Sequence, residues 1–310
     1  MTEKLPSFVR AVEVWIPDGD LLQLRSGAYG HLAQFEQASV ELVLRKGQGL
    51  PGAAWESGRA EVWQQLGPPF VRTEPAREAG LEAAVALPIY RGHEMAAVVV
   101  FFCGARAQTG GCIEVWEPDD EGELAHIDGY YGGLRLFEEQ SRHLKFKRGQ
   151  GLPGAVMQRG SPCIVDDLRN SETFVRAHAA RESGVESGLG IPLFCGSELA
   201  QVVLFLSAES TPLARAFEVW LPTSNGQLEC SQAYYSAGLG NFGRGACEPV
   251  GSGQDLAGKV YESGLPMALD PSRSPSFLRR GEASAAGLDL GIGLPIHDGE
   301  RVRAVVLLFV

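Results

Sequence analysis

Three glycine-rich turns are the segments whose residue types and spacing most clearly could bind a ligand. The central turn runs from Arg148 to Gly154 and reads Arg-Gly-Gln-Gly-Leu-Pro-Gly. The backbone N–H groups of such a turn, at the start of a helix, can bind a phosphate group. However, this turn lacks the Lys-Ser/Thr pair of phosphate-binding P-loops. Phosphate binding is therefore disfavoured, and we expect the turn to be structural.

The cysteines and histidines show no spacing that is typical of a metal site. There is no C-x-x-C pair and no Cys/His pattern typical of zinc, so we predict reduced thiols and no metal. No order of Ser, His and Asp indicates a hydrolase, and Asp166-Asp167 is expected to end a strand. The six cysteines are Cys103, Cys112, Cys163, Cys195, Cys230 and Cys247.

Arg176 and His178 form the best candidate pair for binding an anion. The guanidinium group offers a forked set of donors that fits a carboxylate or a phosphate. An alternative stays open, in which the arginine forms an ion pair and the aromatic residues around it form an ordinary core.

Charge and composition exclude several classes of partner. The 310 residues carry a formal net charge of −11, and 45% of them are hydrophobic. An acidic surface argues against nucleic acid and against anionic lipid. The first residues do not form a signal peptide, and no run of about 18 apolar residues could span a membrane. The expectation is a cytoplasmic globular protein.

The sequence repeats one unit three times. Glu-Val-Trp occurs at Trp15, Trp116 and Trp220, a period of about 100 residues, which suits one small domain. The glycine turn recurs as well, from Gly47 to Gly52 and, in a less regular form, from Gly253 to Gly258. We predict units at residues 1–106, 107–209 and 210–310, the third being the most degenerate.

The second unit shows the expected elements most clearly. Strands are predicted at Cys112 to Trp116 and Leu124 to Tyr131, and alternation from His143 to Lys147 predicts another. Pro153, suited to a first helical position, begins a short helix that ends before Gly160. A strand follows from Pro162 to Val165. Ser171 is the predicted N-cap of a second helix, which ends before Gly184. Two strands, Gly188 to Phe194 and Leu199 to Leu206, close the unit.

The other units depart from this pattern in two places. Pro75 lies inside the second helix of unit one, so that helix is expected to begin at Glu74 or to be interrupted. Gly240 to Gly251 in unit three is glycine-rich and is predicted to be a loop. The last strand of every unit is continuously apolar, so both faces of each sheet should be covered. A neighbouring unit, or a second chain in a homodimer, would cover the second face.

This ordered string of motifs resembles the GAF domain, the small-molecule sensor module of phytochromes and cyclic-nucleotide phosphodiesterases. Unit two carries the string in full, from Gly149 through Phe174-Val175-Arg176 to Ile191-Pro192. The resemblance implies an α+β fold, in which each unit has an antiparallel sheet of about five or six strands with short helices over one face. The long first helix of GAF domains is missing, and no output domain is recognised.

The resemblance also places a ligand pocket between the sheet and the helix that carries Phe-x-Arg. The implied pocket residues in units two and three are Tyr130, Tyr131, Phe137, Met157, Phe174, Arg176, His178, Tyr234, Tyr235, Phe277 and Arg279. No Asp-Glu pair follows Phe174 at the spacing of cyclic-nucleotide-binding GAF domains. No cysteine is followed by the histidine that bilin attachment needs.

The expected function is a non-catalytic small-molecule sensor or signalling module that acts through a regulatory protein on another chain. No cofactor is identified. One alternative is a degenerate scaffold that makes protein contacts and binds no ligand. A more distant alternative, implied by the same resemblance, is a free methionine-(R)-sulfoxide reductase, which would need an attacking and a resolving thiol.

Overall fold

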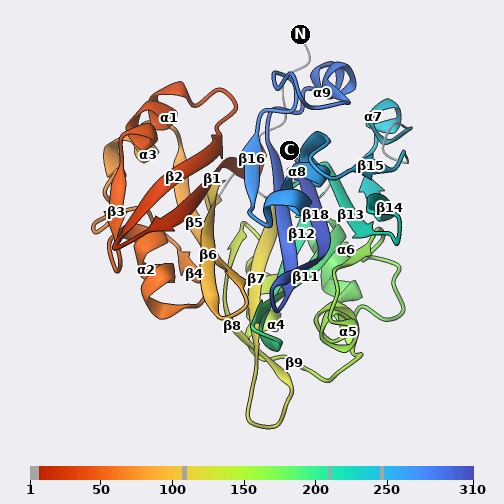
Figure 1. Cartoon of the computed structure of the whole chain (residues 1–310). Coiled ribbons are helices and arrows are strands. Elements are labelled where there is room, and N and C mark those ends of the chain that lie inside the picture. The colour runs from red at the N-terminus through yellow and green to blue at the C-terminus, as the bar shows by residue number, and fades with distance from the viewer. Residues whose placement is uncertain (1–6, 107–109, 209–210, 245–247) are drawn as a thin grey trace.

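The chain forms three six-stranded antiparallel sheets with helices on one face of each (Figure 1). The computed structural model describes residues 7–106, 110–208, 211–244 and 248–310. The fold is therefore α+β, as predicted. The predicted boundaries at 106/107 and 209/210 adjoin or fall within residues outside the described part of the chain.

The first sheet has the strand order β3-β2-β1-β6-β5-β4. Helices α1, α2 and α3 follow β2, β3 and β4 along the chain. The strands are β1 (Val9–Asp18), β2 (Leu21–Ala28), β3 (Val43–Arg45), β4 (Glu61–Trp63), β5 (Leu81–Arg91) and β6 (Glu94–Gly104), and the helices are α1 (Ala33–Val40), α2 (Gly49–Ser57) and α3 (Thr73–Glu78).

The second sheet repeats this order as β9-β8-β7-β12-β11-β10. Its unit has three helices at the equivalent places. The elements are β7 (Gly110–Pro118), β8 (Leu124–Gly132), α4 (Arg135–Arg142), β9 (Lys145–Phe146), α5 (Gly151–Arg159), β10 (Cys163–Val165), α6 (Ala177–Ser183), β11 (Val185–Cys195) and β12 (Glu198–Ala208).

The third sheet has the order β15-β14-β13-β18-β17-β16, again the same topology. The elements are β13 (Ala216–Pro222), β14 (Gln227–Tyr235), α7 (Gly240–Arg244), β15 (Val250–Gly251), α8 (Asp255–Ser263), β16 (Met267–Leu269), α9 (Arg280–Ala286), β17 (Gly291–Asp298) and β18 (Arg301–Phe309).

The glycine turns begin α2, α5 and α8 and are structural, as expected. Inside the central turn, Gly149 N–H donates to Gly154 O at 2.8 Å, and Gly154 N–H donates to Gln150 O at 3.0 Å. These N–H groups are thus used within the turn rather than offered to a ligand. Gly160 ends α5 in the left-handed conformation that glycine favours. Pro153 is the third helical residue, not the first as predicted, but it still lies in the first turn, where N–H groups have no intrahelical partner.

Several predicted helix boundaries need correction. Helix α6 begins at Ala177, and Ser171 lies before it, where its hydroxyl accepts a hydrogen bond from Phe174 N–H at 3.2 Å. Helix α3 begins at Thr73, one residue before the predicted start, and takes Pro75 in its first turn.

The segments before the glycine turns also differ from the prediction. Helices α1 and α4 were not predicted, and only Lys145–Phe146 of the expected strand from His143 to Lys147 forms β9. The predicted loop from Gly240 to Gly251 contains α7 and β15, while residues 245–247 lie outside the described part.

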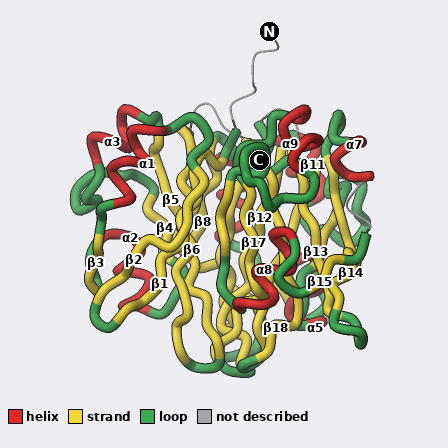
Figure 2. Tube along the Cα trace, turned by 45° about the horizontal axis from the view of Figure 1, so that its top comes forward, coloured by secondary structure: helices red, strands yellow, loops and turns green. Residues whose placement is uncertain are grey.

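The three sheets pack their second faces against one another. One buried cluster joins apolar side chains of all three units, including Phe101, Phe205 and Val306. The ring centroids of Phe101 and Phe205 lie 5.2 Å apart. Figure 2 shows the strands gathered in the middle of the molecule and the helices toward the outside. Neighbouring units, rather than a second chain, therefore cover the apolar strand faces.

Hydrogen bonds between the units complete a closed ring. Gly92 N–H donates to Gly299 O, Gly299 N–H to Gly196 O, and Gly196 N–H to Gly92 O, over 2.8, 3.0 and 2.6 Å. These glycines lie in the hairpin turns that end β5, β17 and β11. Side chains also link the sheet edges, since Gln64 Nε2 donates to Gly129 O and Gln232 Oε1 accepts from Ile164 N–H. Each unit therefore contacts both of the others.

A buried histidine, His297, lies at this junction beside Tyr90 and Phe194. Its side chain is 5% exposed, and neither ring nitrogen has a hydrogen-bond partner among the described residues. Burial, together with the charge of Arg91, lowers the pKa of His297 from 6.5 to about 4. Units one and two carry Tyr90 and Phe194 at the equivalent position, two residues after the proline of the strand.

We predict that His297→Phe flattens the dependence of stability on pH. Between pH 6.5 and about 4 the unfolded chain binds a proton at His297 that the folded chain does not, so wild-type stability falls as the pH falls. Urea unfolding should show the variant gaining about 1–2 kcal/mol over wild type at pH 5 relative to pH 8. His178→Gln, at an exposed histidine, should show no such gain. An unchanged pH profile in His297→Phe would contradict the prediction.

Among the described residues, no helix is both long enough and apolar enough to span a membrane.

Candidate functional site

Each unit buries one glutamate–arginine ion pair beneath its helices. The glutamate belongs to Glu-Val-Trp on the first strand, and the arginine is the last residue of Phe-x-Arg. In unit two, Arg176 donates from both terminal nitrogens to the two carboxylate oxygens of Glu114, with Nη2–Oε2 at 2.8 Å. In unit three, Arg279 pairs with Glu218 in the same way, at 2.7 and 2.9 Å. Such forked pairing is among the strongest hydrogen bonding that side chains make.

Unit one has the same arrangement. Arg72 donates to both carboxylate oxygens of Glu13, at 2.5 and 3.0 Å. Strand alternation explains the position of the glutamate, because residues two apart point to one face of a sheet. Glu13 and Trp15 thus share the helix-covered face, where Trp15 Nε1 donates to Glu13 at 3.0 Å, and Val14 faces the central cluster.

A hydroxyl group also donates a hydrogen bond to each of the three carboxylates. Tyr29 donates to Glu13 at 3.1 Å and Tyr235 to Glu218 at 2.8 Å. In unit two Ser141 takes this role, with its hydroxyl 2.8 Å from Glu114. All three glutamates are fully buried. Burial alone would raise the pKa of Glu114, but the charge and hydrogen bonds of Arg176 lower it below its ordinary value.

Aromatic rings enclose the guanidinium groups. The Arg176 guanidinium carbon lies 4.3 Å from the ring centroid of Phe137 and 5.3 Å from that of Phe174. Arg279 lies 4.2 Å from Phe242 and 5.5 Å from Phe277. The arginine charge is thus matched by a carboxylate and packed against rings. In units two and three, these side chains pack together in the buried cluster between the sheet and the helices.

The structure brings most of the predicted pocket residues together. Tyr131, Phe137, Phe174 and Arg176 lie in the interior of unit two, and Met157 packs at its border. In unit three, the equivalent interior contains Phe277 and Arg279, and half-buried Tyr235 packs at its border.

Two predicted residues lie on the other side of their sheets. Tyr130 belongs to the central cluster, where its hydroxyl donates to Gly104 O at 2.9 Å and its ring lies 5.4 Å from that of Phe8. Tyr234 packs against the same cluster, 6.0 Å from Phe217. Consecutive strand residues face opposite ways, so Tyr130 and Tyr131 could not share one pocket.

His178 is also placed differently from the prediction. Its side chain is 76% exposed and lies 3.5 Å from Glu182, one helical turn further along α6. Arg176, two residues earlier, is 2% exposed. Arg176 and His178 therefore do not form a joint anion-binding pair.

The glutamates are the site residues that sequence reasoning missed. The repeated Glu-Val-Trp served only to mark the start of each unit. The available signal was a carboxylate in an apolar strand, kept two residues before tryptophan in all three copies. A buried carboxylate needs a partner, and an arginine that recurs at one place in every unit is the obvious one.

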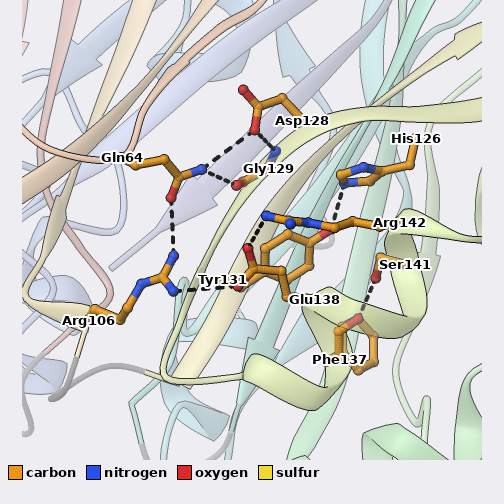
Figure 3. A network of polar contacts seen from close by, with 10 residues as sticks. All are labelled: Gln64, Arg106, His126, Asp128, Gly129, Tyr131, Phe137, Glu138, Ser141 and Arg142. Carbon is orange, nitrogen blue, oxygen red and sulfur yellow. Dashed lines mark hydrogen bonds and ion pairs between the residues drawn. The ribbon is translucent and has the colours of Figure 1, made fainter.

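A polar network ties unit two to unit one beside this interior (Figure 3). Gln64 Nε2 donates to Gly129 O at 2.6 Å, and Arg106 donates to Gln64 Oε1 at 3.2 Å. Nearby, Tyr131 Oη and His126 Nε2 lie 2.7 Å apart. Burial lowers the pKa of His126, which favours a neutral imidazole that can accept the tyrosine hydrogen.

A surface cleft of about 520 Å³ lies beside Arg176, outside the filled interior. The cleft is lined by helix α4, by residues 143–144 that directly follow it, and by residues 175–176. Its lining residues are Leu136, Glu139, Gln140, His143, Leu144, Val175 and Arg176.

The cysteines and acidic residues of the described part of the chain form neither disulfides nor a metal-binding group. In the described part of the chain, no three His, Cys, Asp or Glu side chains are grouped to hold a metal ion. The five cysteines described there are free thiols, and burial raises the pKa of Cys163. Cys247 lies outside the described residues.

The repeated strand order and the helix layer fit the three tandem GAF-like units that the motif string predicts. No family model and no curated protein matches the sequence.

Solved structures align with about one unit of the chain. A GAF domain of a phosphoenolpyruvate-protein phosphotransferase from Coxiella burnetii is 26% identical over 33% of this chain and 60% of its own, with a TM-score of 0.28. The A. aeolicus nlh2 GAF domain is 22% identical over 31% and 58%, with a TM-score of 0.26. Reduced fRMsr of Staphylococcus aureus is 13% identical over 31% and 55%, with a TM-score of 0.25. This chain thus spans less than two thirds of each of these neighbours.

Proposed function

We propose that this protein is a non-catalytic signalling module that acts through contacts with a regulatory protein on another chain. One observation carries the proposal: in all three units the interior beneath the helices is filled by a glutamate–arginine pair and its aromatic neighbours. Displacing Arg176 from Glu114 would leave two buried charges without partners, which is costly. The outer surface is then the part that remains free to transmit a signal.

Native mass spectrometry of the freshly purified protein tests this proposal. The expected result is the mass of the bare chain, with a melting temperature that does not change across a panel of metabolites. A reproducible small adduct together with a raised melting temperature would contradict it, because a ligand that binds the folded state stabilises that state.

Small-molecule sensing in unit two is a second candidate. This candidate is favoured because Arg176 is one of the residues that line the 520 Å³ cleft. Arg176 is also the residue that the sequence indicates as a possible anion-binding group. A ligand there would change the packing of α4 against the rest of unit two. Binding that is lost on Val175→Asp but kept on Leu278→Asp, the equivalent change in unit three, would support this candidate over the first.

Methionine-sulfoxide reduction is the catalytic alternative. A reductase of this kind needs an attacking thiolate and a resolving thiol within reach of each other. Here, however, Cys163 is buried and Cys195 is partly exposed, on a hairpin turn. Reduction of free methionine sulfoxide by the purified protein, lost on Cys163→Ser or Cys195→Ser, would establish this activity and overturn the non-catalytic proposal.

A further inference from the structure

Helix α4 has a second face that its own unit does not cover. Phe137 and Ser141 point into the interior of unit two and are fully buried. The surface cleft is lined by four residues from the opposite side, which have the spacing i, i+3, i+4 and i+7. Residues at that spacing lie on one face of a helix. The four residues are Leu136, Glu139, Gln140 and His143.

Apolar side chains form much of this cleft. Leu136 is 46% exposed and Val175 is 48% exposed, and both are among the few large hydrophobic residues exposed in the described part of the chain. Half-buried Leu144 lies between α4 and β9 and also lines the cleft. Val175 faces outward because its neighbours, Phe174 and Arg176, both face the interior. Exposed apolar patches of this kind are typical of interaction sites.

The shape of the cleft favours a polypeptide over a small molecule. Sites for small molecules enclose most of the ligand surface. This cleft is open to solvent, so it would leave part of a small ligand exposed. A volume of about 520 Å³ accommodates a few side chains of a docked segment, and an amphipathic helix offers them at i, i+3 and i+4.

The charge of the cleft favours a basic partner. Arg176 is paired with Glu114, which leaves Glu139 as the one carboxylate among the lining residues, with the imidazole of His143 in the same lining. The chain as a whole carries a net charge of −11. Complementary charge increases the association rate and the selectivity of binding.

We propose that this cleft docks a short basic amphipathic helix of a partner protein. Apolar side chains of that helix would contact Leu136, Leu144 and Val175, and a lysine or arginine beside them would pair with Glu139. The inference rests on the proposed role as a protein-interaction module and identifies the kind of partner.

Fluorescence anisotropy tests the apolar part of this contact. The probe is a fluorescein-labelled 14-residue peptide of leucine and lysine, with leucine at positions i, i+3, i+4 and i+7. The full chain should bind it saturably, and Leu136→Ser with Val175→Ser should weaken binding at least tenfold. Leu278→Ser removes a leucine that is 69% exposed in unit three and should leave binding unchanged. Failure to bind, or equal binding by the variant and the control, would overturn the proposal.

Charge reversal at Glu139 tests the polar part. Glu139→Lys should weaken binding of the leucine–lysine peptide about fivefold or more and should create binding to a leucine–glutamate peptide of the same pattern. Glu282→Lys makes the same change in net charge on α9 and should do neither. Equal effects of the two variants would show that only overall charge matters, which would overturn the assigned contact.

The same measurements distinguish this inference from the proposed function. The peptide could fail to bind while native mass spectrometry shows the bare chain and the melting temperature stays unchanged. That result would overturn the docking of a helix in the cleft, but it would not contradict the proposed role as an interaction module. A small adduct that is lost in the Leu136→Ser/Val175→Ser variant would overturn both, because it would assign the cleft to a small molecule.

Discussion

Replacement of Arg176 by methionine is expected to lower the free energy of unfolding by about 3–5 kcal/mol. The substitution leaves the carboxylate of Glu114 fully buried without its cation, and methionine keeps much of the packing against Phe137 and Phe174. Urea unfolding at pH 7 measures the loss. Arg77→Met is the matched control, because Arg77 makes a similar 2.7 Å contact with Glu74 but is 69% exposed, so its loss should change the free energy of unfolding far less.

The pH dependence of Arg176→Met follows from the same geometry. In wild type, Arg176 lowers the pKa of Glu114, so the stability from this pair is present above the unfolded pKa and is lost as the pH falls through the folded one. Without the arginine, burial raises the pKa of Glu114 instead. The penalty should then be larger at pH 8 than at pH 5. Equal losses for Arg176→Met and Arg77→Met at both pH values would contradict a structural role of the pair.

The sequence predicts the units and their sheets well because the signals are local and occur three times. Proline, glycine and tryptophan recur at fixed offsets, so an ambiguous segment in one unit can be compared with two others. Helix α4 was missed because Leu136 and Phe137 are its only apolar residues, too few to show a recurring apolar spacing. Packing against the interior, rather than periodicity, determines that this segment is a helix.

The candidate site was only partly predictable. The arginines and phenylalanines were found because they stand together in Phe-x-Arg. Their partner glutamates lie about 60 residues away along the chain, at Glu114 for Arg176 and at Glu218 for Arg279. No local pattern links positions so far apart. The face of Tyr130 depends on the register of β8 against β7, and one residue of shift exchanges the two faces of a strand.

Replacement of Gly154 by alanine is expected to cost about 3 kcal/mol of unfolding free energy. A Cβ atom at this position would lie 2.1 Å from the carbonyl oxygen of Lys147, well inside any allowed contact. The oxygen belongs to the backbone of the glycine turn, so relief requires the turn and the start of α5 to move apart. That movement would also strain the hydrogen bond from Gly149 N–H to Gly154 O.

Gly67→Ala provides the control for Gly154→Ala, because a Cβ atom there meets no atom within 4 Å. It should change stability by less than about 1 kcal/mol in the same urea titration. Gly52 and Gly258 hold the equivalent place in the other units, where the added atom would lie 2.4 and 2.2 Å from a backbone oxygen. Alanine at either should therefore be as costly as at Gly154. If all three variants unfolded like Gly67→Ala, the glycine turn would not be a close backbone contact that fixes the start of α2, α5 and α8.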